Sequence, residues 1–259
     1  MNLFEAILLG IIQGITEFLP VSSSAHLVIV QNILGFKEPE LLFDLVLHIG
    51  TLLATVLIFR KEIIRLFMQP RALLLIIVAG IPTGIIGMTL FHQIEQTFGS
   101  MKIASGCLLV TGSFLWLTKK IPEKSITLEG PLFSFITIPK AFLIGLAQGI
   151  AILPGISRSG ATITTALILK SGRRDAATFS FLLSIPSILG ALALKIYKTP
   201  HLQIPDANPF IIGFLFSLVF GTLSLMFLIK ILMRGEFFKF SYYCWALGIG
   251  GLLAAYTFL

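Results

Sequence analysis

Residues 13–26 read Gln13-Gly-Ile-Thr-Glu17-Phe-Leu-Pro20-Val-Ser22-Ser23-Ser24-Ala-His26, which places an amide, a carboxylate, hydroxyls and an imidazole inside apolar sequence. A second stretch has a related pattern, because residues 148–162 read Gln148-Gly-Ile-Ala-Ile-Leu-Pro154-Gly-Ile-Ser157-Arg158-Ser159-Gly160-Ala-Thr162. Ionisable groups at membrane depth are costly and indicate function by default. We predict that the two stretches meet at depth in a bilayer and form one site.

The composition indicates an integral membrane protein. Of the 259 residues, 56% are hydrophobic and 12% are charged, whereas a soluble domain has about 25% charged residues. Long apolar runs without strict alternation favour helices. The net charge of +7 does not predict a nucleic-acid partner, because the basic residues lie singly or in short clusters between apolar runs, as the positive-inside rule requires.

Six apolar runs are long enough to cross a membrane, namely 41–59, 72–91, 101–118, 176–196, 209–229 and 241–259. Two pairs of shorter runs, 2–19 with 24–35 and 141–153 with 161–169, are interrupted at Pro20 and Pro154, which is typical of re-entrant hairpins. Basic residues place the 60–71, 119–140 and 230–240 loops in the cytoplasm, with the 92–100 and 199–208 loops and both termini outside. The fold class predicted is an all-α integral membrane protein with six transmembrane helices plus two re-entrant helical hairpins, or ten helices.

The order of these elements predicts an inverted-topology repeat within a single polytopic domain, 1–259. The first hairpin enters from outside and the second from the cytoplasm, and each is followed by three spans. The repeats would cover about 1–120 and about 138–259, and Gly10-x-x-Gln13-Gly14 echoes Gly145-x-x-Gln148-Gly149. Such repeats build their sites where broken helices meet near the midplane.

The first stretch offers oxygen ligands for a metal ion. Gln13 and Glu17 are four residues apart and share one helix face. Their side-chain oxygens suit a hard divalent cation, Mg²⁺ or Ca²⁺. The alternative interpretation is that Glu17 is a helix-end residue that extends to the surface, or that it pairs with an arginine for structural reasons only.

The second stretch offers a phosphate-binding surface. Proline followed by serine is typical of a helix start, and a helix N-terminus attracts phosphate through its free N–H groups and partial positive charge. Arg158 adds a planar donor, and Ser157, Ser159 and Thr162 add hydroxyls. The alternative is that the hydroxyls only cap the helix and Arg158 only pairs with Glu17.

Candidate catalytic groups follow Pro20 directly. His26 lies three residues after Ser23 and four after Ser22, so it can share a helix face with either hydroxyl. That spacing permits a hydroxyl nucleophile with a nitrogen base. His48 lies within the run 41–59 without such neighbours in sequence, and we interpret it as structural.

Both motifs closely resemble the bacterial undecaprenyl-pyrophosphate phosphatase family of the bacitracin-resistance type. The first family motif, Glu or Gln followed after three residues by Glu, matches Gln13 and Glu17, with Phe-Leu-Pro-Val-Ser-Ser and then His26 after it. The second, Pro-Gly-x-Ser-Arg-Ser-Gly-x-Thr, matches Pro154 through Thr162 without a gap. The match covers essentially the whole chain, and two motifs in the same order are specific.

The resemblance implies hydrolysis of a polyprenyl pyrophosphate lipid to the monophosphate and inorganic phosphate, which recycles the carrier for cell-wall synthesis. It also implies a divalent cation, a multi-pass protein of the bacterial plasma membrane with a site facing the outer side, and a homodimer. The chain departs from the family at two places. Gln13 supplies one carboxylate fewer, and Tyr243-Cys244 stands where Tyr-Arg is common.

The resulting hypothesis places the pyrophosphate between the two hairpin loops. Arg158, the hydroxyls of Ser22, Ser157, Ser159 and Thr162, and the helix N-termini would bind it, while Glu17 and Gln13 hold the metal ion. Ser23 attacks the terminal phosphorus with His26 as base, or His26 is itself the nucleophile or activates water. The alternative function is a secondary transporter or flippase of a polyprenyl phosphate, because inverted repeats with broken helices are also transporter architecture.

Overall fold

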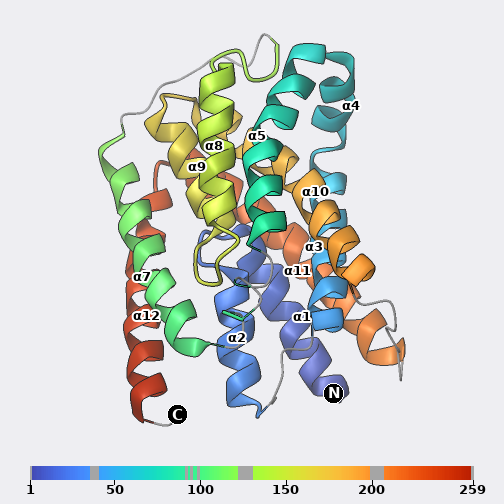
Figure 1. The fold of residues 1–259 in the computed structure, drawn as a ribbon, viewed down its shortest axis with the longest axis vertical. Helices are drawn as coiled ribbons and strands as arrows, with labels where there is room; N and C mark the ends of the chain where they lie inside the picture. Colours follow the sequence, from blue (N-terminus) through green and yellow to red (C-terminus); the bar gives the residue numbers. More distant parts are fainter. Residues whose placement is uncertain are drawn as a thin grey trace.

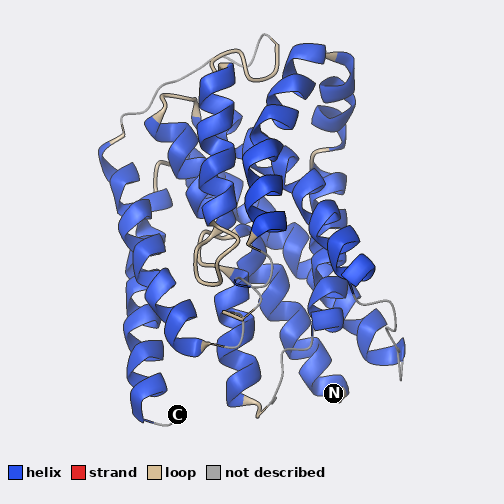
Figure 2. Cartoon of the chain, in the orientation of Figure 1, coloured by secondary structure: helices blue, strands red, loops and turns tan. Residues whose placement is uncertain are grey.

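The computed structural model describes residues 2–35, 41–90, 93, 96–97, 100–121, 131–198 and 207–257. Within these residues every regular element is a helix and no strand occurs (Figure 2). The all-α prediction is therefore confirmed for the described chain. The predicted loops 92–100 and 199–208, and residues 122–130 of the 119–140 loop, lie wholly or largely outside the described residues.

The helices follow the predicted apolar runs to within a few residues. In the first half they are α1 (Leu3–Phe18), α2 (Ser23–Ile33), α3 (Leu41–Ile58), α4 (Arg60–Met68), α5 (Pro70–Thr89) and α7 (Met101–Trp116), which continues into a 3₁₀ turn, Leu117–Lys120. In the second half they are α8 (Ile138–Ile150), α9 (Arg158–Ile168), α10 (Arg173–Lys198), α11 (Ala207–Met233) and α12 (Phe240–Thr257), with a 3₁₀ turn at Phe237–Lys239.

Helix α4 was not predicted, because its residues were assigned to a loop. It turns away from α3 by 73°. Its sequence explains the difference, since Arg60, Lys61 and Arg65 are too many charges for a span, while the large apolar side chains of Ile64, Phe67 and Met68 are exposed. Such an amphipathic helix is typical of one lying along a membrane interface.

Length and composition identify four described helices that can cross a membrane, Pro70–Thr89, Met101–Lys120, Arg173–Leu194 and Ala207–Met233. A fifth is added if the bent pair of α3 and α4 is one span. The structure therefore supports a multi-pass membrane protein. The predicted span 241–259 corresponds to α12, which is not among these four helices.

Two helical hairpins approach each other from opposite ends of the molecule (Figure 1). Helices α1 and α2 run to mid-height and back at the end that carries both termini, and α8 and α9 do the same from the other end. Each hairpin packs against the opposite half of the chain, since α1 contacts α11 most extensively and α8 contacts α5. The two hairpin loops therefore meet near the centre of the bundle.

Small residues set the depth at which the hairpins insert. A Cβ on Gly14 would lie 2.8 Å from the Ser217 carbonyl oxygen of α11, and a Cβ on Gly145 would lie 2.0 Å from the Ala79 carbonyl oxygen of α5. Such close backbone approach is typical of helix pairs in membranes. A larger residue at Gly14 would push α1 away from α11 and displace Glu17, one turn further along α1.

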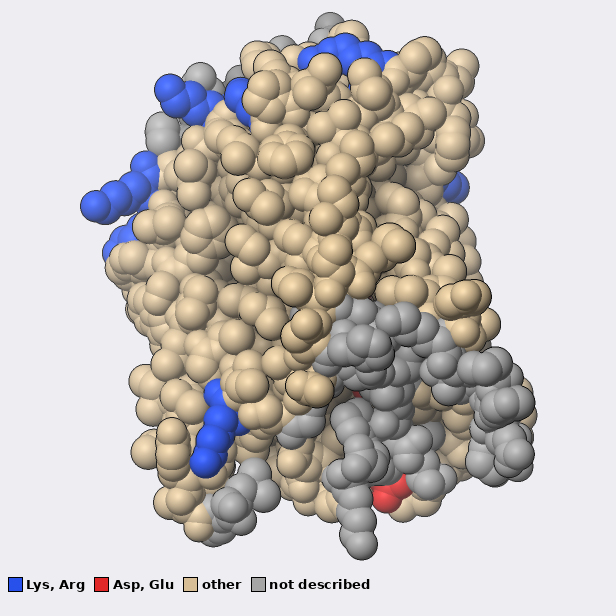
Figure 3. Space-filling model, in the orientation of Figure 1, with Lys and Arg blue, Asp and Glu red and all other residues tan. Residues whose placement is uncertain are grey.

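Basic side chains gather at the end of the molecule opposite the termini, as the visible face shows (Figure 3). The elements at that end carry Arg60, Lys61, Arg65, Arg71, Lys119, Lys120, Lys140, Arg173, Arg174, Arg234 and Lys239. The described parts of the three loops that were predicted to share one side of a membrane thus lie at one end of the fold.

Candidate active site

The two hairpin loops are joined directly by a hydrogen bond, and α12 contacts the first of them. The Gly155 N–H donates to the Ser22 hydroxyl over 3.1 Å, and the Cys244 thiol of α12 donates to the Pro20 carbonyl over 3.4 Å. Thr111 of α7 supports the second loop, because its hydroxyl donates to the Gly155 carbonyl over 2.7 Å. The prediction that the two polar stretches meet is confirmed.

Glu17 is the centre of the site. Its Oε1 atom forms a salt bridge with the Arg158 guanidinium, which comes from the other hairpin. Its Oε2 atom accepts hydrogen bonds from the Ser23 hydroxyl at 2.6 Å and from Gln13 Nε2 at 3.0 Å. The Glu17 side chain is only 5% exposed, so its charge depends on these partners.

Gln13 and Glu17 lie on one face of α1, as predicted. Gln13 is completely buried, and its Oε1 atom has no hydrogen-bond partner among the described residues. A buried carbonyl oxygen without a donor is rare. It is also the kind of ligand that a hard cation prefers.

The start of α9 has the features of an anion site. Ser157 is its N-cap, since its hydroxyl accepts from the Gly160 N–H at 3.0 Å. The backbone N–H groups of Arg158 and Ser159, the first two of the helix, have no partner in the described chain. The Ser159 hydroxyl lies 3.2 Å from that of Ser157. Ser157 thus caps the helix, as the alternative interpretation held, and two amides remain available for an anion.

Thr162 lies away from the site. Its side chain is fully buried, and its hydroxyl donates to the Arg158 carbonyl at 2.8 Å and lies 2.5 Å from the Ser180 hydroxyl of α10. Its hydroxyl is thus engaged within the protein, and its contact with substrate stays a prediction. It instead fixes α9 against α10, which orients Arg158.

Ser22 and Ser23 have different roles in the loop. Ser22 has a positive φ of 64° and makes no side-chain cap for α2, because its hydroxyl accepts from Gly155 and lies 3.1 Å from the Ser24 hydroxyl. Ser23, the first residue of α2, instead directs its hydroxyl to Glu17. Of the two, Ser23 is the one beside the charged groups.

In the structure, the described contacts of His26 do not include Ser23. The Nδ1 atom of His26 lies 2.8 Å from the Ser22 carbonyl, which can only accept, so we assign the proton to Nδ1. Its Nε2 atom then accepts from the Tyr243 hydroxyl at 2.8 Å. The Ser23–His26 hydrogen bond proposed from spacing is absent among the described contacts, and Tyr243 is a neighbour of the site that the spacing did not reveal.

His48 lies closer to the site than its sequence context indicated. From α3 its Nε2 atom lies 3.6 Å from Glu17 Oε2, and its side chain is 30% exposed. The assignment of a purely structural role rested on the absence of polar neighbours in sequence. The neighbour comes from α1, and no local pattern could have indicated it.

The residues present fit a divalent cation that substrate oxygens help to hold. No group of three His, Cys, Asp or Glu side chains clusters within the described part of the chain, so the protein alone offers no closed metal cage there. Glu17 supplies one carboxylate and Gln13 one buried oxygen without a donor. Mg²⁺ is commonly bound by one or two carboxylates together with substrate phosphates.

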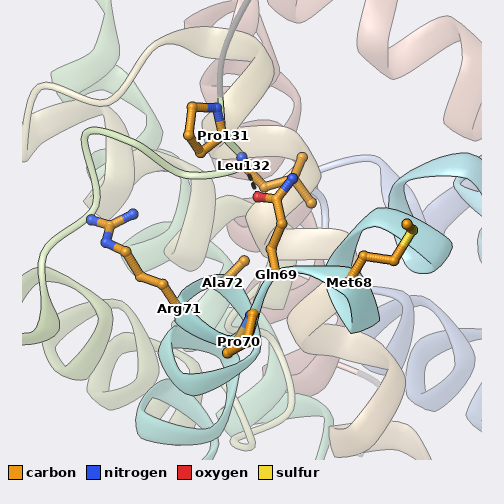
Figure 4. A pocket seen from close by; sticks show the side chains of 7 residues that line it. All are labelled: Met68, Gln69, Pro70, Arg71, Ala72, Pro131 and Leu132. Carbon is orange, nitrogen blue, oxygen red and sulfur yellow. Dashed lines mark hydrogen bonds between the residues drawn. The ribbon is translucent and has the colours of Figure 1, made fainter.

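A separate cavity of about 540 Å³ lies at the corner between α4 and α5 (Figure 4). Its polar groups are already engaged, since Arg71 donates to the carbonyls of Phe133 and Ile136 at 3.2 and 2.9 Å, and the Leu132 N–H donates to Gln69 at 2.8 Å. It lies at the basic end of the fold and offers none of the chemistry described above.

The fold is that of a multi-pass membrane protein. At its centre, a candidate anion site combines a buried carboxylate–guanidinium pair, a hydroxyl and two free helix amides. The chain belongs to the family of the bacitracin resistance protein BacA, whose model matches residues 6–250. It is 44% identical over 255 residues to the undecaprenyl-diphosphatase of Carboxydothermus hydrogenoformans, covering 96% of each chain. It is 40% identical over 282 residues to that of Desulfatibacillum aliphaticivorans, covering 99% of this chain and 100% of the relative. It is 36% identical over 282 residues to that of Methanobrevibacter smithii, covering 100% of both.

Proposed function

We propose that this protein hydrolyses undecaprenyl pyrophosphate to undecaprenyl phosphate and inorganic phosphate. The reaction recycles the lipid carrier for cell-wall synthesis and confers bacitracin resistance. Relatives named undecaprenyl-diphosphatase align with nearly the whole chain. The observation in this molecule that carries the proposal is the junction of the hairpins, where Arg158 and two free amides of α9 lie beside Glu17 and Ser23.

The membrane arrangement that suits this function has six transmembrane helices and two re-entrant hairpins. The packing supports two inverted repeats, about 1–120 and about 138–259, because equivalent helices have equivalent partners. Helix α1 packs on α11, and its counterpart α8 packs on α5, the counterpart of α11. The basic end would face the cytoplasm of a bacterial plasma membrane, with the site opening to the outer side.

Arg158 binds the terminal phosphate of the substrate. A terminal phosphate can replace the Glu17 carboxylate on the guanidinium and also accept from the free N–H groups of Arg158 and Ser159. Phosphoryl transfer needs neutralisation of charge on the phosphate oxygens more than any other assistance. These donors supply it without rearrangement of the helix.

Ser23 is placed to attack the terminal phosphorus, with Glu17 as its base. The Ser23 hydroxyl already donates to Glu17 at 2.6 Å. Attack forms the bond from Ser23 Oγ to phosphorus, breaks the bond to the bridging oxygen and releases undecaprenyl phosphate, while the proton passes to Glu17. Water then hydrolyses the phosphoserine to inorganic phosphate. For His26 to act as base or nucleophile, it must first release Tyr243.

A divalent cation, Mg²⁺ or Ca²⁺, would be held by Glu17 and Gln13 together with phosphate oxygens. When bound it would neutralise charge on the pyrophosphate. Removing metal with a chelator should stop phosphate release, and added cation should restore it. A homodimer, implied by the family resemblance, can be tested by measuring the mass of the detergent-solubilised protein.

The decisive experiment is phosphate release from farnesyl or undecaprenyl pyrophosphate by purified protein in detergent. We expect release by the unmodified protein, none by Arg158→Ala, and full release by Lys239→Ala, whose exposed side chain pairs with Glu236 at 2.7 Å far from the site. A transporter or flippase of polyprenyl phosphate would release no phosphate in any case. Near-normal hydrolysis by Arg158→Ala would contradict the role given to Arg158.

A further inference from the structure

Helix α4 has an exposed face made of large apolar and basic side chains. Ile64, Phe67 and Met68 are 62%, 70% and 75% exposed, and Lys61 and Arg65 are exposed as well. At about 3.6 residues per turn, the three apolar side chains lie on one side of the helix, and the two basic side chains follow along one edge of that side. A face of this kind suits the boundary between water and hydrocarbon rather than either solvent alone.

The opposite side of α4 fixes the rotation of the helix. Leu66 is buried, and Glu62, the acidic residue of α4, lies 4.0 Å from Arg174 at the start of α10. Arg60, at the bend, donates to the Leu57 carbonyl of α3 at 3.0 Å. Because the acidic side chain faces the protein, the charge on the exposed face is positive.

The direction of α4 suits a helix that lies along a membrane. The helix turns away from α3 by 73°, and it lies at the end of the bundle where basic side chains gather (Figures 1 and 3). With α3 crossing a bilayer, α4 would run close to the membrane plane, at the depth of the headgroups. Helices at that depth insert their apolar side chains at the acyl boundary and place lysine and arginine beside anionic headgroups.

We propose that the exposed face of α4 is a binding surface for acidic phospholipids such as phosphatidylglycerol. Its three apolar side chains pack among acyl chains, and Lys61 and Arg65 pair with headgroup phosphates. Charge complementarity selects an acidic lipid over a neutral one, and three large apolar side chains favour a lipid over an acidic soluble protein. The surface lies at the basic end of the fold, away from the hairpin junction, and the inference does not depend on the proposed hydrolysis.

The test is amide hydrogen exchange of residues 60–68 in nanodiscs that hold one copy of the protein. Discs of phosphatidylcholine alone are compared with discs that also contain phosphatidylglycerol with the same acyl chains. Each basic residue beside an anionic surface contributes a factor of about five, so phosphatidylglycerol should slow exchange by up to about thirtyfold. High salt should weaken the effect.

The variant Lys61→Gln with Arg65→Gln should lose this slowing. Both side chains are exposed, so the variant should fold. The matched control is Lys140→Gln with Lys239→Gln, which removes the same charge from the same end of the fold. Those two ammonium groups already contact the Phe135 carbonyl at 3.0 Å and Glu236 at 2.7 Å, so the control should keep the slowing.

Three results would overturn the inference. The first is equal exchange of residues 60–68 in the two kinds of disc for the unmodified protein, which decides the matter whatever the variants do. The second is a double variant of Lys61 and Arg65 that keeps the slowing. The third is exchange that slows only in discs holding two copies, which would make a second copy of this chain the occupant. Phosphate release is measured separately, so none of these results bears on the proposed hydrolysis.

Discussion

Replacing Arg158 by glutamine should destabilise the fold as well as stop hydrolysis, because it leaves the Glu17 carboxylate buried without its counter-charge. Removing one partner of a buried ion pair costs about 3–5 kcal/mol. Glu17 is 5% exposed and Arg158 is 19% exposed, and Glu17 keeps its hydrogen bonds from Ser23 and Gln13. We therefore expect the lower end, about 3 kcal/mol.

Replacing Glu17 instead of Arg158 should destabilise the fold less. In Glu17→Gln the charge left behind is that of Arg158, which is more exposed and can reach water, so we expect about 1–2 kcal/mol. The double variant, Glu17→Gln with Arg158→Gln, leaves no unpaired charge and should be more stable than Arg158→Gln alone. All three variants should lose hydrolysis. The double variant should therefore regain stability relative to Arg158→Gln without regaining activity.

Thermal unfolding in detergent, followed with a thiol-reactive dye, measures these differences because the free thiols of Cys107 and Cys244 are half-buried and fully buried. For a chain of this size 1 kcal/mol corresponds to about 2–4 °C in Tm, so Arg158→Gln should lower Tm by about 6–12 °C. An unchanged Tm for Arg158→Gln, or a double variant less stable than that single variant, would refute the account of a buried charge pair.

Two further substitutions test the geometry of the site. Gly155→Ala should lower Tm by more than about 5 °C, because φ is +97° and the new Cβ would lie 2.1 Å from the Ala104 carbonyl oxygen. The control is Gly80→Ala on α5, which should keep or raise Tm because nothing lies within 4 Å of the new Cβ. Equal Tm values for the two variants would contradict the close approach at Gly155. Tyr243→Phe removes the hydrogen bond to His26 Nε2 at 2.8 Å, which should cost about 1 kcal/mol and lower Tm by about 2–4 °C. Because Ser23 and Glu17 carry the proposed reaction, kcat should stay unchanged, and a kcat altered about fivefold would show that His26 takes part.

Much of the fold was predictable because apolar runs and proline positions are local signals. The two hairpins, with breaks at Pro20 and Pro154, could be located from the sequence, and the charge pattern indicated that they come from opposite ends. The junction between Glu17 and Arg158 followed from those two facts. Helix α4 was missed because its charges resemble a loop, and only its alternation of basic and large apolar residues distinguishes it.

The contacts that the sequence did not predict have a common physical cause. Spacing along a helix says which residues share a face, but not which face meets a neighbour. Thr162 is one turn from Arg158, yet the packing of α9 on α10 directs its hydroxyl to Ser180. His26 is one turn from Ser22, yet its Nε2 atom meets Tyr243, 217 residues later.

The salt bridge between the hairpins explains why the site suits a pyrophosphate. Without substrate, Glu17 from one hairpin neutralises Arg158 from the other, so an anion must displace a carboxylate to reach the guanidinium. A terminal phosphate of higher charge, with the free amides of α9 as additional donors, competes better than a singly charged anion. Displacement would free the Glu17 carboxylate to accept the proton of Ser23, as the proposed mechanism requires. In the proposed mechanism, substrate binding would therefore also release Glu17 to act on Ser23, because one salt bridge holds Glu17 and Arg158 together until the pyrophosphate arrives.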